Sequence, residues 1–141
     1  MSNANCIAYG IIAVGFLAAS PPVSADVVAV VSSKSAVTTL SKSQVVDIFL
    51  GKTTRFPDGS QALPLDQSEG TIVRDEFYIK LVGKSAAQMK AYWSKIIFTG
   101  RGQPPKDVPN DAEVKKRLVE NPTAIGYMDA NMVDASLRVV F

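Results

Sequence analysis

The sequence of 141 residues contains no histidine, and its one cysteine, Cys6, lies within the first 25 residues. The lack of histidine excludes imidazole metal ligands and histidine-based catalytic triads. The lack of a second cysteine excludes an internal disulfide, and removal of the first 25 residues would exclude a cysteine nucleophile too. The chemistry that remains is that of hydroxyls, carboxylates, arginine, lysine and backbone amides. We therefore expect no metal site and no cofactor.

Charged side chains are absent from the first 25 residues, MSNANCIAYGIIAVGFLAASPPVSA. Their apolar part, 7–19, is shorter than the roughly twenty residues that a membrane-spanning helix needs. The residues Val23-Ser24-Ala25 form a small-x-small pattern typical of a signal-peptide cleavage site. We predict a signal peptide at 1–25, cleavage near Ala25, a periplasmic location and no stable membrane insertion after cleavage.

A large excess of charge of either sign is also absent. All 15 basic and 13 acidic residues lie after residue 25, and they form no block of like charge and no basic stripe. Nucleic acid and an anionic membrane are therefore not expected as partners. Residues 26–141 are long enough for one domain with a modest core.

Capping signals and hydrophobic periodicity divide residues 26–141 into alternating strands and helices. The patterns Ser41-x-x-Gln44 and Ser85-x-x-Gln88 are capping boxes, which predict two helix starts. The alternation predicts a single compact α/β domain of three layers, with a mostly parallel sheet flanked by helices. Strands are expected over 26–33, 61–65, 124–128 and 137–141, helices over 41–51, 70–83, 85–100 and 111–120, and irregular structure over 101–110.

The helix that Ser85 opens carries four apolar residues with helical spacing, which we expect to face inward. They are Met89, Trp93, Ile96 and Ile97.

The segment Ser68-Glu69-Gly70-Thr71 joins a predicted strand to a predicted helix. Unpaired amides and the positive end of a helix favour an anion at such a joint. Ser68 and Thr71 add hydroxyl donors, and Gly70 lets a ligand approach the backbone. Arg74, one turn further on, can supply a fork of donors for an oxyanion. A plainer interpretation is that Ser68 is an N-cap and Glu69 an acidic first-turn residue; spacing alone favours it.

Two carboxylates, Asp66 and Glu69, stand beside this segment and would repel a dianion. They could accept the proton of a monoprotonated oxyanion, or they could pair with Arg74 and keep the site closed. No set of nucleophile, base and orienting group can be assembled from the sequence. We therefore expect no catalytic residues and no enzyme activity.

Four stretches, in this order, resemble the phosphate-type periplasmic solute-binding proteins of ABC transporters: LSKSQVVDIFLGKTTRFPDG, LPLDQSEGTIVRDEFY, AYWSKIIFTGRGQPP and VENPTAIGYM. The resemblance implies a type 2 periplasmic-binding-protein-like fold and an exported protein. It also implies phosphate or a similar small oxyanion as ligand, and an ABC permease or another envelope protein as partner. The chain resembles the short, single-domain members, which correspond to one lobe of the larger proteins.

In the larger phosphate binders, a Ser-Gly-Thr stretch opens a helix and binds phosphate, with an arginine just before it. Gly70 and Thr71 match the last two positions of that stretch. Glu69 replaces the serine, and Leu65 lies about where the arginine is expected. Our own candidate for the missing cation is Arg74, which would act from the helix side.

Ser32 and Ser33 end the first predicted strand, and we expect them to face the same crevice, because ligands of open α/β sheets sit at the carboxyl ends of strands. Two functions stay open. The first is a periplasmic protein that binds phosphate or another oxyanion and is related to ABC transporter substrate-binding components. The alternative is a non-transport interaction module that reuses the fold with a vestigial anion site.

Overall fold

The computed structural model describes Gly15 and residues 26–141. The predicted signal peptide therefore lies outside the described residues, apart from Gly15. Within the described part, none of the helices has the length and apolar character needed to span a membrane.

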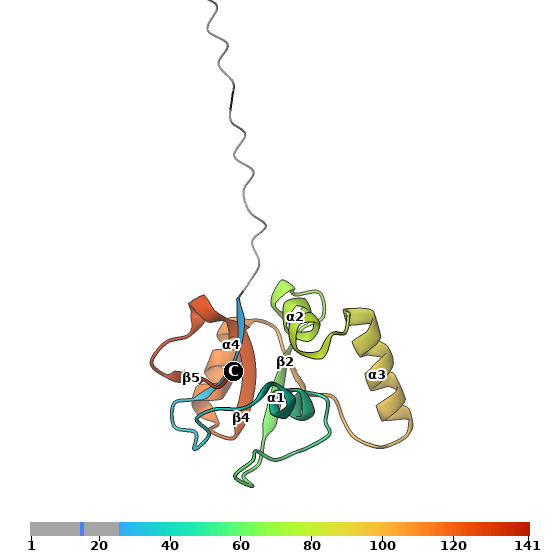
Figure 1. The fold of residues 1–141 in the computed structure, drawn as a ribbon, viewed down its shortest axis with the longest axis horizontal. Coiled ribbons are helices and arrows are strands. Elements are labelled where there is room, and N and C mark those ends of the chain that lie inside the picture. The colour runs from blue at the N-terminus through green and yellow to red at the C-terminus, as the bar shows by residue number, and fades with distance from the viewer. Residues whose placement is uncertain (1–14, 16–25) are drawn as a thin grey trace, which may run out of the picture.

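One open sheet forms the middle of the domain, with its strands in the order β3-β2-β4-β1-β5 (Figure 1). The strands are β1 (Val27–Ser32), β2 (Leu63–Gln67), β3 (Lys106–Val108), β4 (Ala124–Asp129) and β5 (Leu137–Val139).

The strands of the sheet run mostly in one direction, as the sequence predicted, but one strand is reversed. β2 is parallel to β3 and β4, and β1 is antiparallel to both of its neighbours, β4 and β5, so that β1 alone runs against the other four. The start of β1 lies beside the end of β4: Val27 pairs with Asp129, and the amide of Ala130 donates to the carbonyl of Asp26. Hydrophobic alternation locates a strand but carries no information on its direction, so the reversal of β1 was not predictable from it.

Helices cover both faces of the sheet, so the predicted three-layer α/β class is confirmed. Both predicted capping boxes are present, at Ser41 with Gln44 and at Ser85 with Gln88. The helix predicted over 70–83 forms as α2 followed by a π-helical turn, η1. The helical segments are α1 (Lys42–Phe49), α2 (Ile72–Phe77), η1 (Tyr78–Val82), α3 (Ala86–Phe98), α4 (Asp111–Glu120) and the short 3-10 helix η2 (Ala130–Met132).

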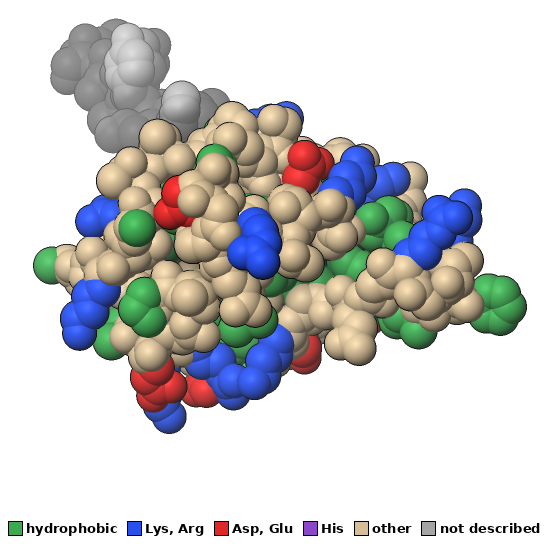
Figure 2. Space-filling view, turned by 90° about the horizontal axis from the view of Figure 1, so that it is seen from below, with side chains coloured by type: hydrophobic (Ala, Val, Ile, Leu, Met, Phe, Trp, Pro, Cys, Tyr) green, Lys and Arg blue, Asp and Glu red, His purple; other side chains and the backbone are tan. Residues whose placement is uncertain are grey.

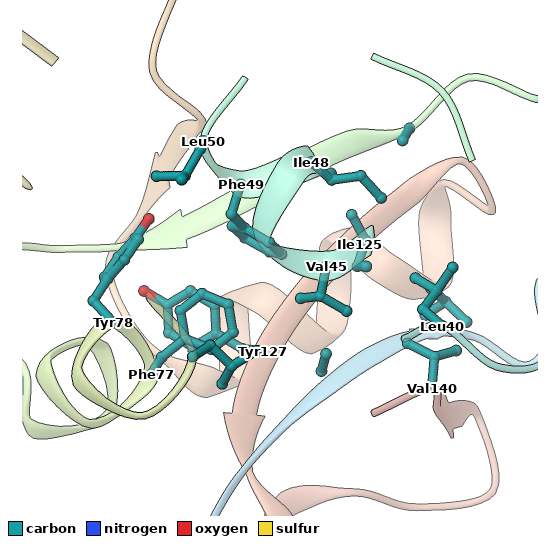
Figure 3. Close-up of a cluster of buried hydrophobic side chains, with 14 of the residues drawn as sticks. Leu40, Val45, Ile48, Phe49, Leu50, Phe77, Tyr78, Ile125, Tyr127 and Val140 are labelled. Atoms are coloured by element: carbon teal, nitrogen blue, oxygen red, sulfur yellow. The ribbon is translucent and has the colours of Figure 1, made fainter. Parts of the chain in front are cut away.

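Two hydrophobic clusters lie on the two faces of the sheet. On the face covered by α1 and α2, the Phe77 ring stacks on Tyr127 with ring centroids 3.9 Å apart, and Phe49 packs edge-on against both (Figure 3). On the other face, Val114 and Leu118 of α4 pack in the second cluster. Within the part of the chain that the structure describes, the members of both clusters lie between residues 27 and 140.

Three local predictions need correction. A three-residue strand, β3, forms inside the segment predicted to be irregular; only Val108 of it is buried, so no alternation marked it. The sequence pattern predicts Asp111 as the N-cap of the helix over 111–120, but the N-cap of α4 is Asn110, one residue earlier. Ile97 is exposed, because Met89, Trp93 and Ile96 define the inward face and Ile97 is one residue further round the helix.

Candidate functional site

The segment 68–71 lies at the edge of the sheet where the parallel strands β2, β3 and β4 end. The amide of Ser68 donates to the carbonyl of Val108 at 3.0 Å, which ties the segment to β3. Gly70 has φ +91°, a left-handed conformation that glycine adopts without strain, and a side chain there would meet only open space. This edge is where open α/β sheets hold their ligands.

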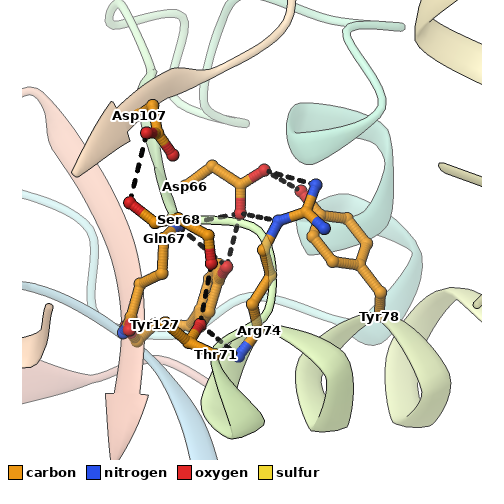
Figure 4. Close-up of polar contacts among 8 residues, drawn as sticks. All are labelled: Asp66, Gln67, Ser68, Thr71, Arg74, Tyr78, Asp107 and Tyr127. Atoms are coloured by element: carbon orange, nitrogen blue, oxygen red, sulfur yellow. Dashed lines mark hydrogen bonds and ion pairs between the residues drawn. The ribbon is translucent and has the colours of Figure 1, made fainter. Parts of the chain in front are cut away.

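Thr71, and not Ser68, is the N-cap of α2. Its hydroxyl accepts from the amide of Arg74 at 3.4 Å and donates to the carbonyl of Ser68 at 3.0 Å. The Ser68 hydroxyl instead donates to the carboxylate of Asp107 at 3.2 Å (Figure 4). The plainer interpretation, which made Ser68 the cap, is therefore wrong. The Ser68 hydroxyl does not cap the helix and lies instead at the edge of the sheet, beside Asp107.

Asp66, the residue before the end of β2, is the centre of a buried polar network (Figure 4). Asp66 is only 6% exposed, and both oxygens of its carboxylate accept hydrogen bonds. One oxygen, Oδ1, accepts from the Tyr127 hydroxyl and from the amide of Gln67 at 2.9 Å. The other, Oδ2, accepts from the Tyr78 hydroxyl at 2.9 Å. Both oxygens are thus satisfied by groups of the same chain.

Arg74 pairs with this carboxylate. Its Nε lies 3.4 Å from Oδ1 of Asp66, and its Nη2 donates to Oδ2 at 3.4 Å. The guanidinium carbon also stands 5.0 Å from the centre of the Tyr78 ring, and the Arg74 side chain is 11% exposed. Of the two alternatives for Asp66, the structure shows the one in which it pairs with Arg74. Glu69 is exposed and takes no part in this network.

The ionisation of this network follows from its burial. Burial raises the pKa of the Asp66 carboxyl above 3.8, and the Tyr127 hydroxyl, Arg74 and the Tyr78 hydroxyl oppose that rise. Burial and the facing Asp66 carboxylate raise the pKa of both Tyr78 and Tyr127, so both hydroxyls stay protonated and act as donors. For Arg74, burial acts to lower the pKa, but the Asp66 carboxylate raises it above its ordinary value.

An open groove of about 520 Å³ runs beside the segment, between the starts of α2 and α4 and the helix η2. Its walls include Ile72, Val73 and Met132, together with the carboxylate of Asp111. That carboxylate accepts from Nε2 of Gln67 at 2.5 Å. The residues that line the groove include no lysine or arginine, so the groove itself does not supply a cation for an oxyanion.

Ser32 and Ser33 do not join this site. Because β1 runs antiparallel to β4, while β2 runs parallel to it, the end of β1 lies at the opposite edge of the sheet from Ser68. The Ser32 hydroxyl accepts from the amide of Lys34 at 3.2 Å, and the amide of Ser33 donates to the carbonyl of Ser136. The expectation that these serines share the crevice was wrong, because it assumed a parallel first strand.

The sequence analysis missed several members of the network. Tyr78 lies four residues after Arg74 and therefore on the same side of the helix, a spacing that could have suggested a contact. Tyr127 and Asp107 come from other strands, and nothing near them in the sequence points to Asp66 or Ser68.

Comparisons with known proteins establish the fold. No family model matches the chain, and no curated protein matches it. Solved structures do match. One, from Clostridium perfringens, is described as a phosphate ABC transporter substrate-binding protein with bound phosphate; it has a TM-score of 0.63 and 20% identity over 81% of this chain. An ABC-type phosphate transport receptor from Vibrio cholerae has a TM-score of 0.63 and 18% identity over 81% of this chain.

A third match is PstS from Borrelia burgdorferi, with a TM-score of 0.57 and 14% identity. At these identities the likeness shows the fold, and the periplasmic-binding-protein-like fold expected from the sequence is confirmed. The chain covers only 43%, 44% and 46% of the length of the three proteins.

Proposed function

We propose that this chain is a non-enzymatic, exported binding protein of the phosphate-type substrate-binding class, and that its ligand is phosphate or a similar small oxyanion. The fold supports the class, since the matching structures include one with bound phosphate. The observation that carries the proposal is the position of residues 68–71. They stand at the carboxyl edge of parallel strands, with Arg74 one turn into the following helix.

The ligand groups in this proposal are the Ser68 hydroxyl, the Gly70 backbone, the Thr71 hydroxyl and the Arg74 guanidinium. Within the described chain, the amide of Gly70 has no hydrogen-bond acceptor. Nη1 of Arg74 likewise has no partner among the described residues, although Nε and Nη2 face Asp66. An oxyanion would therefore share Arg74 with Asp66, or displace it.

This competition sets the expected affinity. A ligand must draw Arg74 away from a carboxylate that is already in place, and Glu69 and Asp107 add negative charge nearby. A single lobe also leaves the ligand partly in water, where each hydrogen bond contributes less. We expect a dissociation constant on the order of millimolar, unless a second chain completes the site.

Thermal unfolding of residues 26–141 in phosphate, sulfate and chloride at matched ionic strength tests the proposal. A ligand at ten times its dissociation constant stabilises by about 1.4 kcal/mol, a shift of several degrees for a domain of this size. We expect phosphate to raise the unfolding temperature above that in chloride, and Thr71→Val to reduce the rise. An equal response to all three anions would contradict oxyanion binding.

A second candidate function is a non-transport interaction module, with an envelope protein as its partner and a vestigial anion site. The pairing of Asp66 with Arg74 favours it, because that pair closes the site without a ligand. Affinity capture from envelope extract distinguishes the two functions. A module of this kind would recover the same partner with and without phosphate, whereas an oxyanion sensor would recover it in a phosphate-dependent manner.

A further inference from the structure

The helix α3 lies at one end of the molecule, apart from the sheet (Figure 1). Only Met89 and Trp93 of this helix are buried. At its C-terminal end Phe98 is 92% exposed and Ile97 is 56% exposed. The two side chains expose apolar surface that the fold of the described chain does not bury, and this surface is available to an external partner.

The charge around α3 is one-sided. The segment 84–106 contains five of the 15 basic residues and none of the 13 acidic residues, so the rest of the chain has more acidic than basic residues. The cations are spaced five or six residues apart, so no run of like charge marks them in the sequence, and the charge pattern alone gave no reason to expect an anionic membrane as a partner. They are Lys84, Lys90, Lys95, Arg101 and Lys106.

None of these five cations forms an ion pair within residues 26–141. All except Lys84 are classed as exposed. Figure 2 shows basic side chains together with protruding hydrophobic side chains at the end of the molecule where α3 lies. The charge of these five cations is therefore available to an external partner.

The spacing of residues along α3 places its basic side chains near the exposed Ile97 and Phe98. Lys90 and Phe98 are eight residues apart, and Lys90 and Ile97 are seven apart, so all three lie on the outward side of α3. Lys95 is one turn before Phe98, and Arg101 lies three residues after Phe98, the last residue of the helix. The tip, defined as Ile97 and Phe98, is thus flanked by cations on both sides along the chain.

We propose that this α3 tip docks reversibly on the surface of an anionic phospholipid bilayer. Lysine and arginine near such a surface are attracted to the anionic headgroups, while Phe98 and Ile97 enter the boundary between headgroups and acyl chains. The tip protrudes from the molecule. A headgroup layer is soft and accepts such a tip without a preformed pocket, whereas a rigid acidic protein would need a pocket to receive it. The surface is peripheral, and the docking needs no membrane-spanning segment.

Co-sedimentation with vesicles tests this docking, using residues 26–141, which contain the whole described core. The vesicles contain phosphatidylcholine alone or phosphatidylcholine mixed with phosphatidylglycerol. We expect binding to the mixed vesicles at low salt, and weak binding to phosphatidylcholine or at high salt. Lys95→Glu should lower the partition coefficient by at least roughly fivefold, from the loss of one cation near the surface. Phe98→Ser should lower it by a similar factor.

Two control variants make the same kind of substitution away from the tip, and so test whether the position of the changed residue matters. Lys34→Glu changes the net charge as Lys95→Glu does, and Phe141→Ser removes another exposed phenylalanine. We expect both control variants to bind as the wild type does. Equal binding to the two kinds of vesicle, or equal losses in control and tip variants, would overturn the proposal. Binding to polyglutamate but to neither vesicle would also overturn it, and would assign the tip to an acidic protein.

Discussion

Asp66 and Arg74 form an ion pair at the end of β2, with Nε of the arginine 3.4 Å from Oδ1 of the aspartate. The two residues come from successive elements, the strand and the helix that the segment 68–71 connects. The arginine that our proposal assigns to a ligand is therefore already held by a buried carboxylate. Oxyanion binding and the internal ion pair compete for the same guanidinium group.

Tyr127→Phe should destabilise the domain by about 1–3 kcal/mol, because it removes a buried donor to the Asp66 carboxylate and an acceptor for the amide of Gln67. Urea unfolding measures the change. Tyr92→Phe is the matched control, since its hydroxyl donates to the carbonyl of Leu50 outside this network. A loss no larger for Tyr127→Phe than for the control would show that the Asp66 network contributes little to stability.

Asp66 should make the domain more stable as the pH falls. Because burial raises the pKa of this carboxyl in the folded state, the folded protein binds the proton more tightly than the unfolded chain does. Its contribution to the free energy of unfolding therefore increases as pH falls through the raised pKa toward 3.8. Unfolding at several pH values should show that the wild type gains stability relative to Asp66→Asn as the pH falls.

Asp134 provides a comparison of opposite sign. The hydrogen bond from Lys115, followed by those from Ser136, lowers the pKa of Asp134 to about 2. The stability that it contributes is present above 3.8 and is lost as pH falls through about 2. The wild type should thus lose its advantage over Asp134→Asn at low pH. Parallel pH profiles for the Asp66 and Asp134 variants would refute the sign assigned to Asp66.

Gly126→Ala should destabilise the domain by about 1–3 kcal/mol through overpacking between β4 and α4. A side-chain carbon at this position would lie 2.7 Å from Cγ1 of Val114, so either the Val114 side chain or the helix that carries it would have to shift. Gly102→Ala is the control, because its added carbon would lie 3.6 Å from the nearest atom, a side-chain carbon of Ile96. Chemical unfolding of both variants measures the difference; similar stabilities would mean that α4 adjusts freely.

Local features of the fold were predictable from the sequence. The capping boxes at Ser41 and Ser85 depend on residues three positions apart, and both formed as expected. The direction of β1 and the existence of β3 depend on pairing with distant strands, and the sequence pattern missed both. Tertiary packing determines which strands pair, and the residues near a strand in the sequence do not reveal its partner.

The candidate site was predictable to a smaller extent. Asp66 and Arg74 were predicted from the sequence, with their pairing as one of two alternatives. Tyr78 and Tyr127, whose hydroxyls satisfy the buried carboxylate, were not predicted. The plainer interpretation of the segment 68–71 made Ser68 the cap of α2, although Thr71, three residues later, has that role. Hydroxyls three residues apart are equally good capping groups, and only the path of the chain after β2 selects between them.

The most direct test of the competition is a calorimetric titration of phosphate into residues 26–141, as wild type and as Asp66→Asn. The asparagine keeps the shape of the aspartate and removes the charge that holds Arg74. We expect weak binding to the wild type and roughly tenfold tighter binding to the variant. No detectable binding to either protein would contradict oxyanion binding at this site, and would favour the interaction module as the function.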